Sequence, residues 1–361
     1  MAHIKRVYII AEAGVNHNGS TDMAKQLIDA AAAAGADAVK FQTFKANMLA
    51  TVGASKAKYQ IAHAGAGDSQ IEMLRKLELD EAAHLELAKH CRNRGIQFLS
   101  TPFDTESLNM LVKIMKVPLL KISSGEITNA PFLLSAAGTG KPIILSTGMS
   151  TLAEVKTALG ILAFGHARKL KKPGCAAFRQ ALQSAEGQNY LKRKVTLLHC
   201  TTEYPTPFSE VNLLAMRAMR KIFNISVGLS DHTTGVAVST AAVALGASVI
   251  EKHFTLDRGL VGPDHKASLE PDELFQLVKS IREVEAALGS PKKRPTQGEL
   301  SNMKVARKSL VALCDIARGE LLTEDNLGCK RPGTGLSPLK YWKLLGKKAA
   351  RGYRKDDLVA R

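Results

Sequence analysis

Apolar and polar residues follow two alternating patterns along the first 290 residues of the chain. Short apolar runs of strand length are separated by segments in which apolar residues recur every three or four positions, as on one face of a helix. The eight runs expected to be strands are residues 7–14, 36–43, 97–102, 118–126, 141–148, 195–200, 225–229 and 248–250. The helices expected to follow them are residues 21–34, 81–94, 105–114, 131–137, 152–163, 211–222, 236–246 and 271–288.

Eight strands that alternate with eight helices are typical of a (β/α)8 (TIM) barrel, and this is the fold class that we predict for residues 1–289. An open, doubly wound parallel sheet is the alternative, because the count of elements alone does not separate the two. Residues 44–79 are too long for a simple connection, so we expect them to form a functional loop over one face.

The chain changes character after residue 289. Residues 290–304 begin with a polar segment flanked by Pro291 and Pro295, and they are expected to be a linker. Residues 305–361 contain short apolar runs and a tight Arg-Pro-Gly turn, which predicts a small, loop-rich C-terminal domain. A unit of this size is marginally stable alone and is expected to dock on another surface.

The formal charge of +17 is concentrated in residues 166–194 and 301–361. Such a balance suits a nucleic acid, an anionic small molecule or only a basic surface. Aromatic residues make up 5% of the chain, which is low for a base-stacking surface and argues against nucleic acid as the main partner. No apolar run is long enough for a membrane span, and the N-terminus lacks the pattern of a signal peptide. Five scattered cysteines without a CxxC motif predict reduced thiols and a cytoplasmic location.

Two histidines stand at the ends of neighbouring predicted strands. His232 follows the seventh apolar run, and His253 follows the eighth. The carboxyl ends of parallel strands in one barrel open on the same face, where ligands bind. Two imidazoles at this face can share one divalent metal ion, and two unrelated hydrogen-bonded histidines are the alternative.

Lysines and hydroxyl groups stand at the other strand ends. Lys40 and Lys121 lie within otherwise apolar strands, where an unpaired ammonium group is costly, so each requires an anion. Together with several serine and threonine hydroxyls, they suit a phosphate or carboxylate ligand. An ion pair with Glu12 or Glu126 is the alternative for either lysine.

At these residues the chain resembles the sialic acid (nonulosonate) synthases, which are phosphoenolpyruvate-condensing barrels with a C-terminal antifreeze-like (SAF, β-clip) domain. The matching stretches occur in the family's order and span nearly the whole chain. They are residues 9–19, 39–45, 99–103, 120–126, 145–149, 199–207, Gly228-Leu-Ser-Asp-His232, 250–257, 262–270 and Lys330-Arg-Pro-Gly333.

The resemblance implies that phosphoenolpyruvate condenses with an N-acetylated mannosamine-type sugar and water to give a nine-carbon keto acid and phosphate. His232 and His253 would hold Mn²⁺ or Mg²⁺ as a Lewis acid. The positions that match phosphoenolpyruvate-binding residues are Lys40, Thr101, Lys121, Ser124, Ser146 and Ser230. Those that match sugar-side residues are Glu12, Gln42, Thr202, Tyr204 and Asp264. Glu126 is the candidate for proton handling, since a carboxylate there can position or deprotonate the water.

The family also implies a domain-exchanged homodimer, in which Arg331 of one subunit reaches the N-acetyl side of the sugar in the other. Two features depart from the family. Thr201 and Thr202 stand after the His-Cys pair, where many relatives carry an asparagine, and the Thr202 hydroxyl would take the place of the amide. The basic insert at residues 166–194 is expected at the barrel end away from the chemistry, where it would affect surface charge or assembly.

The primary hypothesis is therefore an N-acetylneuraminate synthase that uses N-acetylmannosamine. An N,N'-diacetyllegionaminate synthase, which uses 2,4-diacetamido-2,4,6-trideoxymannose, carries the same motifs and is the alternative. Gly125 argues against the pseudaminic acid branch, which carries phenylalanine there. A synthase of 3-deoxy sugar acids and a protein that binds anionic polymers are two further readings. The preferred sugar, the metal used and the role of the insert stay open.

Overall fold

The computed structural model describes residues 6–57, 60–61, 63, 67–167 and 172–360. The chain forms two compact units, Met1–Gly289 and Ser290–Arg361. Each unit is described separately below. No helix in the described part of the chain is long and apolar enough to cross a membrane.

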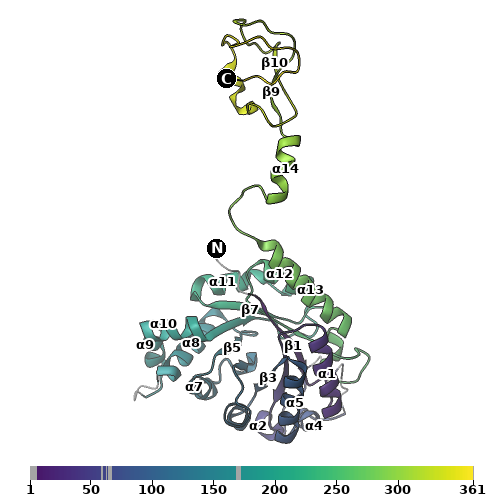
Figure 1. Cartoon of the computed structure of the whole chain (residues 1–361). Helices are drawn as coiled ribbons and strands as arrows, with labels where there is room; N and C mark the ends of the chain where they lie inside the picture. Colours follow the sequence, from purple (N-terminus) through teal and green to yellow (C-terminus); the bar gives the residue numbers. More distant parts are fainter. Residues whose placement is uncertain (1–5, 58–59, 62, 64–66, 168–171, 361) are drawn as a thin grey trace. The chain divides into compact units, whose positions relative to one another are not determined.

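The first unit is built on eight parallel strands (Figure 1). They are β1 (Tyr8–Gly14), β2 (Ala38–Thr43), β3 (Gln97–Pro102), β4 (Leu120–Ile122), β5 (Ile143–Ser146), β6 (Val195–His199), β7 (Ser226–Asp231) and β8 (Val249–His253). Strand β1 pairs with both β2 and β8, and the order around the sheet is β3-β2-β1-β8-β7-β6-β5-β4. Because β3 also lies beside β4, the sheet curves into a nearly closed barrel. The predicted barrel is confirmed, and the open doubly wound sheet is excluded.

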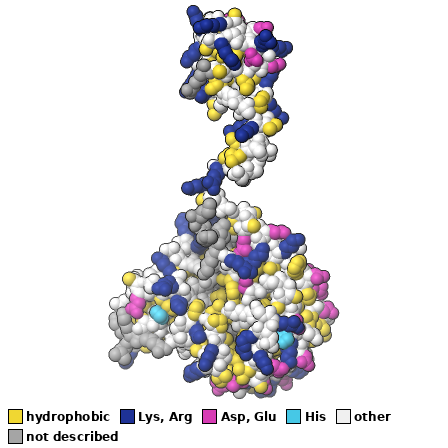
Figure 2. Space-filling view, viewed as in Figure 1, with side chains coloured by type: hydrophobic (Ala, Val, Ile, Leu, Met, Phe, Trp, Pro, Cys, Tyr) yellow, Lys and Arg dark blue, Asp and Glu magenta, His cyan; other side chains and the backbone are white. Residues whose placement is uncertain are grey.

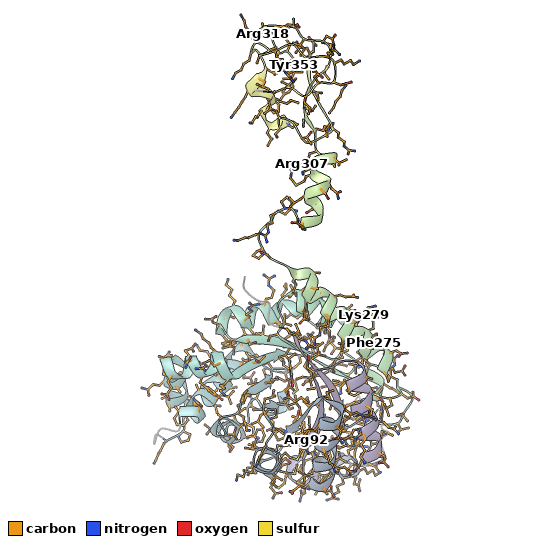
Figure 3. The ribbon with its side chains drawn as sticks, in the orientation of Figure 1. Arg92, Phe275, Lys279, Arg307, Arg318 and Tyr353 are labelled. Carbon is orange, nitrogen blue, oxygen red and sulfur yellow. The ribbon has the colours of Figure 1, made fainter. Side chains whose placement is uncertain are left out.

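Helices cover the outside of this barrel. They are α1 (Thr21–Ala33), α5 (Glu81–Arg94), α6 (Thr105–Asn109) with a π-helical turn at Met110–Ile114, α7 (Ala130–Gly138), α8 (Leu152–Ala167), α11 (Leu213–Phe223), α12 (Ala237–Ala244) and α13 (Pro271–Leu288). Helix α13 buries Leu274 and Leu277 and turns Phe275 and Lys279 outward (Figure 3). The residues that follow the three-four spacing in the sequence therefore form the side of α13 that packs on the barrel.

The interior of the barrel has two layers. The lower layer is apolar and consists of Ile10, Ala38, Leu99, Ile144, Leu198 and Val249. Successive side chains of a strand point to opposite faces, so the residue two positions further along each strand also points inward. Those residues are Glu12, Lys40, Thr101, Ser146, Cys200 and Glu251. A layer of charged and hydroxyl-bearing side chains thus lies directly above the apolar layer, toward the carboxyl ends of the strands.

Two insertions extend the barrel. Residues 44–80 carry α2 (Ala46–Leu49) and α4 (Gln70–Leu77), and Ser69 caps α4 with a capping box. The basic insert forms α9 (Cys175–Gln183) and α10 (Ala185–Lys194), which pack on α8, while its residues 168–171 lie outside the described part. The insert precedes β6 and so joins this strand at its amino end.

The second unit begins with helix α14 (Gln297–Ala306), which has no buried residue and falls partly within the expected linker. It continues with an antiparallel pair, β9 (Ser309–Ala312) and β10 (Leu327–Lys330), and a short helix, α15 (Tyr341–Leu344). Its own core contains Leu310, Leu327, Tyr353 and Val359, among others. Lys and Arg side chains are spread over its visible face (Figure 2).

Candidate active site

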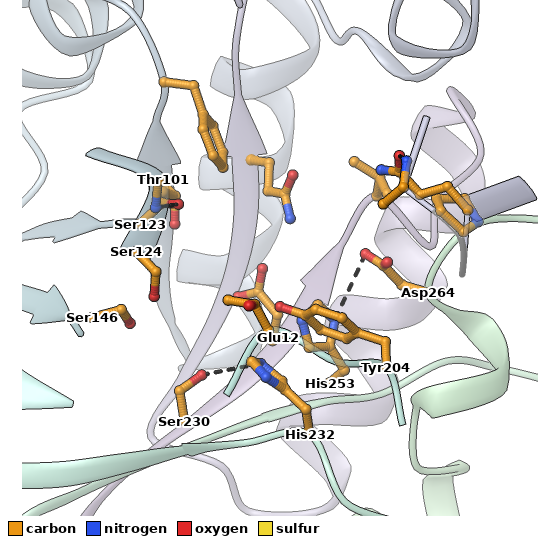
Figure 4. A pocket seen from close by; sticks show the side chains of 18 of the residues that line it. Glu12, Thr101, Ser123, Ser124, Ser146, Tyr204, Ser230, His232, His253 and Asp264 are labelled. Atoms are coloured by element: carbon orange, nitrogen blue, oxygen red, sulfur yellow. Dashed lines mark hydrogen bonds and ion pairs between the residues drawn. The ribbon is translucent and has the colours of Figure 1, made fainter. Parts of the chain in front are cut away.

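A cavity of about 480 Å³ opens at the carboxyl ends of the barrel strands. Most of the side chains that the sequence predicted for the site line it together, and they come from all eight strands or the loops that follow them (Figure 4). They are Glu12, Lys40, Gln42, Thr101, Lys121, Ser124, Ser146, Thr202, Tyr204, Ser230, His232, His253 and Asp264. Residues up to 252 positions apart in sequence therefore meet in one site.

Two nominated residues are not among the residues that line this cavity. The Glu126 carboxylate accepts a hydrogen bond of 2.6 Å from Asn129 Nδ2, which follows in the same turn and holds it away from the lysines. Arg331 belongs to the second compact unit, where its Nε donates to the carbonyl oxygen of Ala306 at 3.1 Å. The roles expected for Glu126 and Arg331 stay predictions.

Both buried lysines are paired with carboxylates. Lys40 forms an ion pair with Glu12 and lies 3.7 Å from Glu251, and the Lys121 ammonium lies 3.1 Å from Glu251. All four side chains are at most 5% exposed. The sequence named Glu12 and Glu126 as alternative partners, so Glu12 is correct for Lys40, whereas the partner of Lys121 is Glu251.

The two carboxylates of this cluster differ in how readily they take up a proton. Burial raises the pKa of Glu12 to about 7, although the neighbouring Lys40 works against that shift. For Glu251, burial also acts to raise the pKa, but Lys121 and Lys40 outweigh it and hold the pKa well below its usual range. Glu251 is therefore a fixed anion between two lysines, and Glu12 can gain or lose a proton near neutral pH.

A set of donors continues from the lysines along β3 to β6. Lys40 Nζ donates to Thr101 Oγ1 at 2.7 Å. The backbone N–H of Gly148 faces both Ser124 Oγ at 3.0 Å and Cys200 Sγ at 3.1 Å. The two ammonium groups, the hydroxyls of Thr101 and Ser124 and the Gly148 N–H lie together, and we call this group the anion pole because such donors suit an anion. Its role in binding one stays a prediction.

The two histidines lie side by side, with ring centroids 5.5 Å apart. His232 Nδ1–H donates to the carbonyl oxygen of Thr201 at 2.5 Å, which leaves Nε2 unprotonated. Ser230 Oγ lies 3.3 Å from Nε2 but donates its proton to Glu251. His253 Nδ1 is buried without a hydrogen-bond partner among the described residues, and Asp264 Oδ2 is 3.9 Å away.

This pair suits a divalent cation that takes two nitrogen ligands from the protein. Burial lowers the pKa of His232 to about 4 and that of His253 well below its usual value, so both rings are neutral and carry lone pairs. Among the described residues, no group of three or more His, Cys, Asp or Glu side chains is arranged to hold a metal. Further ligands would have to come from substrate or water.

The remaining side of the cavity is apolar. The apolar wall consists of Val15, Leu49, Met73, Leu74, Leu77 and Phe103. Most of it comes from α2 and α4, in the long connection that the sequence marked as functional. The ring centroid of Tyr204, which also lines the cavity, lies 4.2 Å from that of His232. One cavity thus joins an anion pole, a histidine pair and an apolar wall.

Three parts of this site were missed from the sequence. Glu251 lies two residues before His253, so strand alternation places both on the inner face and could have identified it. Lys252, which stands between them, points to the outer face of the sheet for the same reason. Cys200 and the apolar wall gave no signal, because a buried thiol and apolar helix residues are ordinary core residues.

Comparisons with known proteins identify the family. Residues 27–293 match the NeuB family and residues 307–360 match the SAF domain. The chain is 48% identical over 356 residues to N,N'-diacetyllegionaminic acid synthase of Campylobacter jejuni, covering 99% of both chains. It is 36% identical to human N-acetylneuraminate-9-phosphate synthase over 98% of this chain and 91% of that protein.

A solved structure agrees with this assignment. It is the N-acetylneuraminic acid synthetase of Leptospira borgpetersenii in complex with citrate, with a TM-score of 0.66 and 32% identity over 83% of this chain and 91% of that chain. The chain therefore belongs to the NeuB family of nonulosonic acid synthases and carries the SAF domain that its C-terminal motif indicated.

Proposed function

We propose that this protein is a nonulosonic acid synthase that joins phosphoenolpyruvate to 2,4-diacetamido-2,4,6-trideoxymannose. The observation that carries the proposal is the combination, in one cavity, of an anion pole and an apolar wall. Phosphoenolpyruvate suits the first, and a sugar that bears a C6 methyl and two acetamido methyl groups suits the second.

The choice of sugar differs from the primary hypothesis of the sequence. N-Acetylmannosamine carries a hydroxymethyl group and a hydroxyl group where the trideoxy sugar carries a methyl and an acetamido group. A hydroxyl buried against the wall would lose its hydrogen bond to water, whereas each buried methyl group is stabilised by about 0.8 kcal/mol. The 48% identity to a legionaminic acid synthase, against 36% to the human enzyme, favours the same sugar.

At the anion pole, Lys121, Ser124 and the Gly148 N–H would bind the phosphate and carboxylate of phosphoenolpyruvate. C3 of phosphoenolpyruvate then forms a bond to the aldehyde carbon of the open-chain sugar, and the aldehyde oxygen takes a proton. Water adds to C2, and inorganic phosphate leaves with its bridging oxygen. The atoms balance as phosphoenolpyruvate, sugar and water giving the nine-carbon keto acid and phosphate.

Proton transfer falls to Glu12 in this scheme. Its pKa of about 7 lets it give up a proton to the new hydroxyl or receive one from water at working pH. It also lines the cavity between the lysines and the histidines. A divalent ion held by His232 and His253 would polarise the aldehyde carbonyl. The wall and the loop that carries it would exclude bulk water from the reacting carbons.

Phosphate release tests the proposal. Phosphoenolpyruvate is mixed with the enzyme and Mn²⁺, and with the trideoxy sugar, N-acetylmannosamine or a phosphorylated pentose. We expect the highest kcat/KM with the trideoxy sugar. A higher value with N-acetylmannosamine would support the second candidate, an N-acetylneuraminate synthase, and a higher value with the pentose would support a 3-deoxy sugar acid synthase. Absence of phosphate with all three would overturn the synthase proposal.

A further inference from the structure

A fully buried ion pair lies behind the two histidines. Asp231 and Lys252 face each other in register across β7 and β8, with Lys252 Nζ 3.0 Å from Asp231 Oδ2. The side chains are 1% and 0% exposed. Neither lines the cavity, since both point to the outer face of the sheet. The catalytic scheme above gives them no role.

Each member of the pair directly precedes a histidine of the site. Asp231 stands before His232, and Lys252 stands before His253. Strand alternation therefore makes the outward ion pair and the inward imidazole pair two faces of the same backbone segment. A shift of Asp231 against Lys252 would move the two rings relative to each other.

The ion pair also fixes the backbone after His232. Asp231 Oδ1 accepts the backbone N–H of Thr233 at 2.9 Å and its hydroxyl at 2.7 Å. Lys252 Nζ donates to the carbonyl oxygen of Thr233. Asp231 Oδ2 accepts a 2.6 Å hydrogen bond from Ser239, which lies in α12. The Asp231 carboxylate and Lys252 Nζ therefore fix the backbone next to His232. Lys252 comes from β8, the strand that carries His253.

We propose that the Asp231–Lys252 pair positions His232 and His253 at the spacing needed to share a divalent cation. The inference rests on the metal site of the proposed function. Burying two charges costs free energy that an apolar pair would avoid, so a buried pair is weak evidence for stability alone. What this pair adds is a fixed register at the point where two ligands must stay together.

Mn²⁺ binding to the full chain tests the proposal without turnover. The protein is stripped with a chelator, and free Mn²⁺ is measured by electron paramagnetic resonance during titration, with no substrate present. The variants are Asp231→Asn, the double variant Asp231→Asn/Lys252→Met, and Ser239→Ala, which removes only one hydrogen bond to Asp231. The double variant leaves no unpaired buried charge and so keeps the fold testable.

We expect Mn²⁺ affinity to fall at least tenfold in the double variant and by a smaller factor in Ser239→Ala. Phosphoenolpyruvate affinity without metal should change much less, because Lys40, Lys121 and the Gly148 N–H come from β2, β4 and the turn after β5. Leu162→Ala in the core of α8 is the matched control, which should lower the melting temperature and leave Mn²⁺ affinity intact.

The possible results distinguish a failure of the positioning role from a failure of the proposed function. Wild-type affinity for Mn²⁺ in the folded double variant would overturn the positioning role and leave the proposed function standing. An equal loss in Leu162→Ala would also overturn it, because the effect would then follow stability alone. A wild-type protein that binds no Mn²⁺ would overturn both the inference and the metal site on which it rests.

Discussion

The Lys121 ammonium lies 3.1 Å from the Glu251 carboxylate inside the barrel, and both side chains are 5% exposed. Neither charge can therefore be removed alone without leaving the other short of a partner. An apolar residue at position 121 looks harmless from the strand sequence, but the structure shows that it would remove one of the two lysines that hold Glu251 ionised.

This relationship predicts different results for a single and a double variant. Lys121→Met should weaken phosphoenolpyruvate binding by roughly 1.5–3 kcal/mol, the value of a charge-assisted hydrogen bond, and should lower the melting temperature. Lys121→Met/Glu251→Gln should regain thermal stability but not affinity. Calorimetric titration and thermal unfolding measure the two effects. Normal phosphoenolpyruvate affinity in the double variant would show that Lys121 has no role in binding.

Gly148 should tolerate no side chain. A Cβ atom there would lie 2.9 Å from both Ser124 Oγ and Thr202 Cγ2, closer than atoms normally approach. Gly148→Ala should therefore push Ser124 from the anion pole and raise the KM for phosphoenolpyruvate about tenfold or more, the effect of one lost hydrogen bond to a charged group. Gly174→Ala, where a Cβ meets nothing within 4 Å, is the control. Equal KM values in both variants would contradict the crowding argument.

The apolar wall predicts a change of sugar preference. Leu74 is partly buried and lines the cavity, so Leu74→Gln should be accepted by the fold and should offer hydrogen bonds to hydroxyls. The ratio of kcat/KM for the trideoxy sugar to that for N-acetylmannosamine should fall about threefold to tenfold, on the order of one or two methyl-group contacts. Leu85→Gln on the exposed side of α5 is the matched variant. An unchanged ratio in Leu74→Gln would remove the wall from the specificity argument.

His17 predicts a loss of stability in acid. Its ring is fully buried, its Nδ1 accepts the N–H of Gly19 at 3.0 Å, and burial lowers its pKa to about 4. A depressed pKa gives stability that is complete above the unfolded value of about 6.5 and is lost as the pH falls toward 4, by up to roughly 3 kcal/mol. His17→Asn keeps an acceptor for Gly19 and cannot protonate.

Thermal unfolding between pH 7.5 and 4.5 compares the two proteins. The melting temperature of the wild type should fall more steeply with acid than that of His17→Asn. Parallel curves would assign the acid sensitivity to other groups.

The expected domain exchange has its own test. If Arg331 acts on the barrel of a second subunit, Arg331→Ala and His232→Ala should each be inactive, and a mixture with exchanged subunits should regain up to about a quarter of the activity. Phosphate release after mixing, with native mass spectrometry to show hybrid dimers, measures this. Hybrid dimers without activity would contradict the shared site.

The barrel could be predicted because each strand is an apolar run bounded by turn residues, and helix α5 even has the bounds that the sequence indicated. The count of strands and helices alone did not separate a closed barrel from an open sheet, since closure depends on β3 lying beside β4 and not on either strand alone. Strand β4 is shorter than expected, because the chain turns into a 3-10 helix at Ser124–Glu126. That turn is what directs Glu126 to Asn129.

The polar half of the site was predictable because burying a lysine or histidine in an apolar strand costs free energy. Such a residue therefore indicates a ligand or an ion-pair partner. Glu251 was not predicted as a site residue, although it lies two positions before His253 and alternate residues of a strand share a face. The apolar wall could not be foreseen. Its residues come from a loop whose path over the barrel is set by tertiary contacts, such as the packing of Met73 and Leu77 on Phe44.

The apolar layer formed by Ile10, Ala38 and their neighbours seals the barrel beneath the lysines. Among the described residues, the cavity therefore opens only toward the carboxyl ends of the strands. Under the proposed function, phosphoenolpyruvate bound beside the lysines would have to enter before the sugar, and phosphate formed there would leave after the sugar acid. The six apolar side chains of this layer would then set the order of binding and release, although none of them lines the cavity.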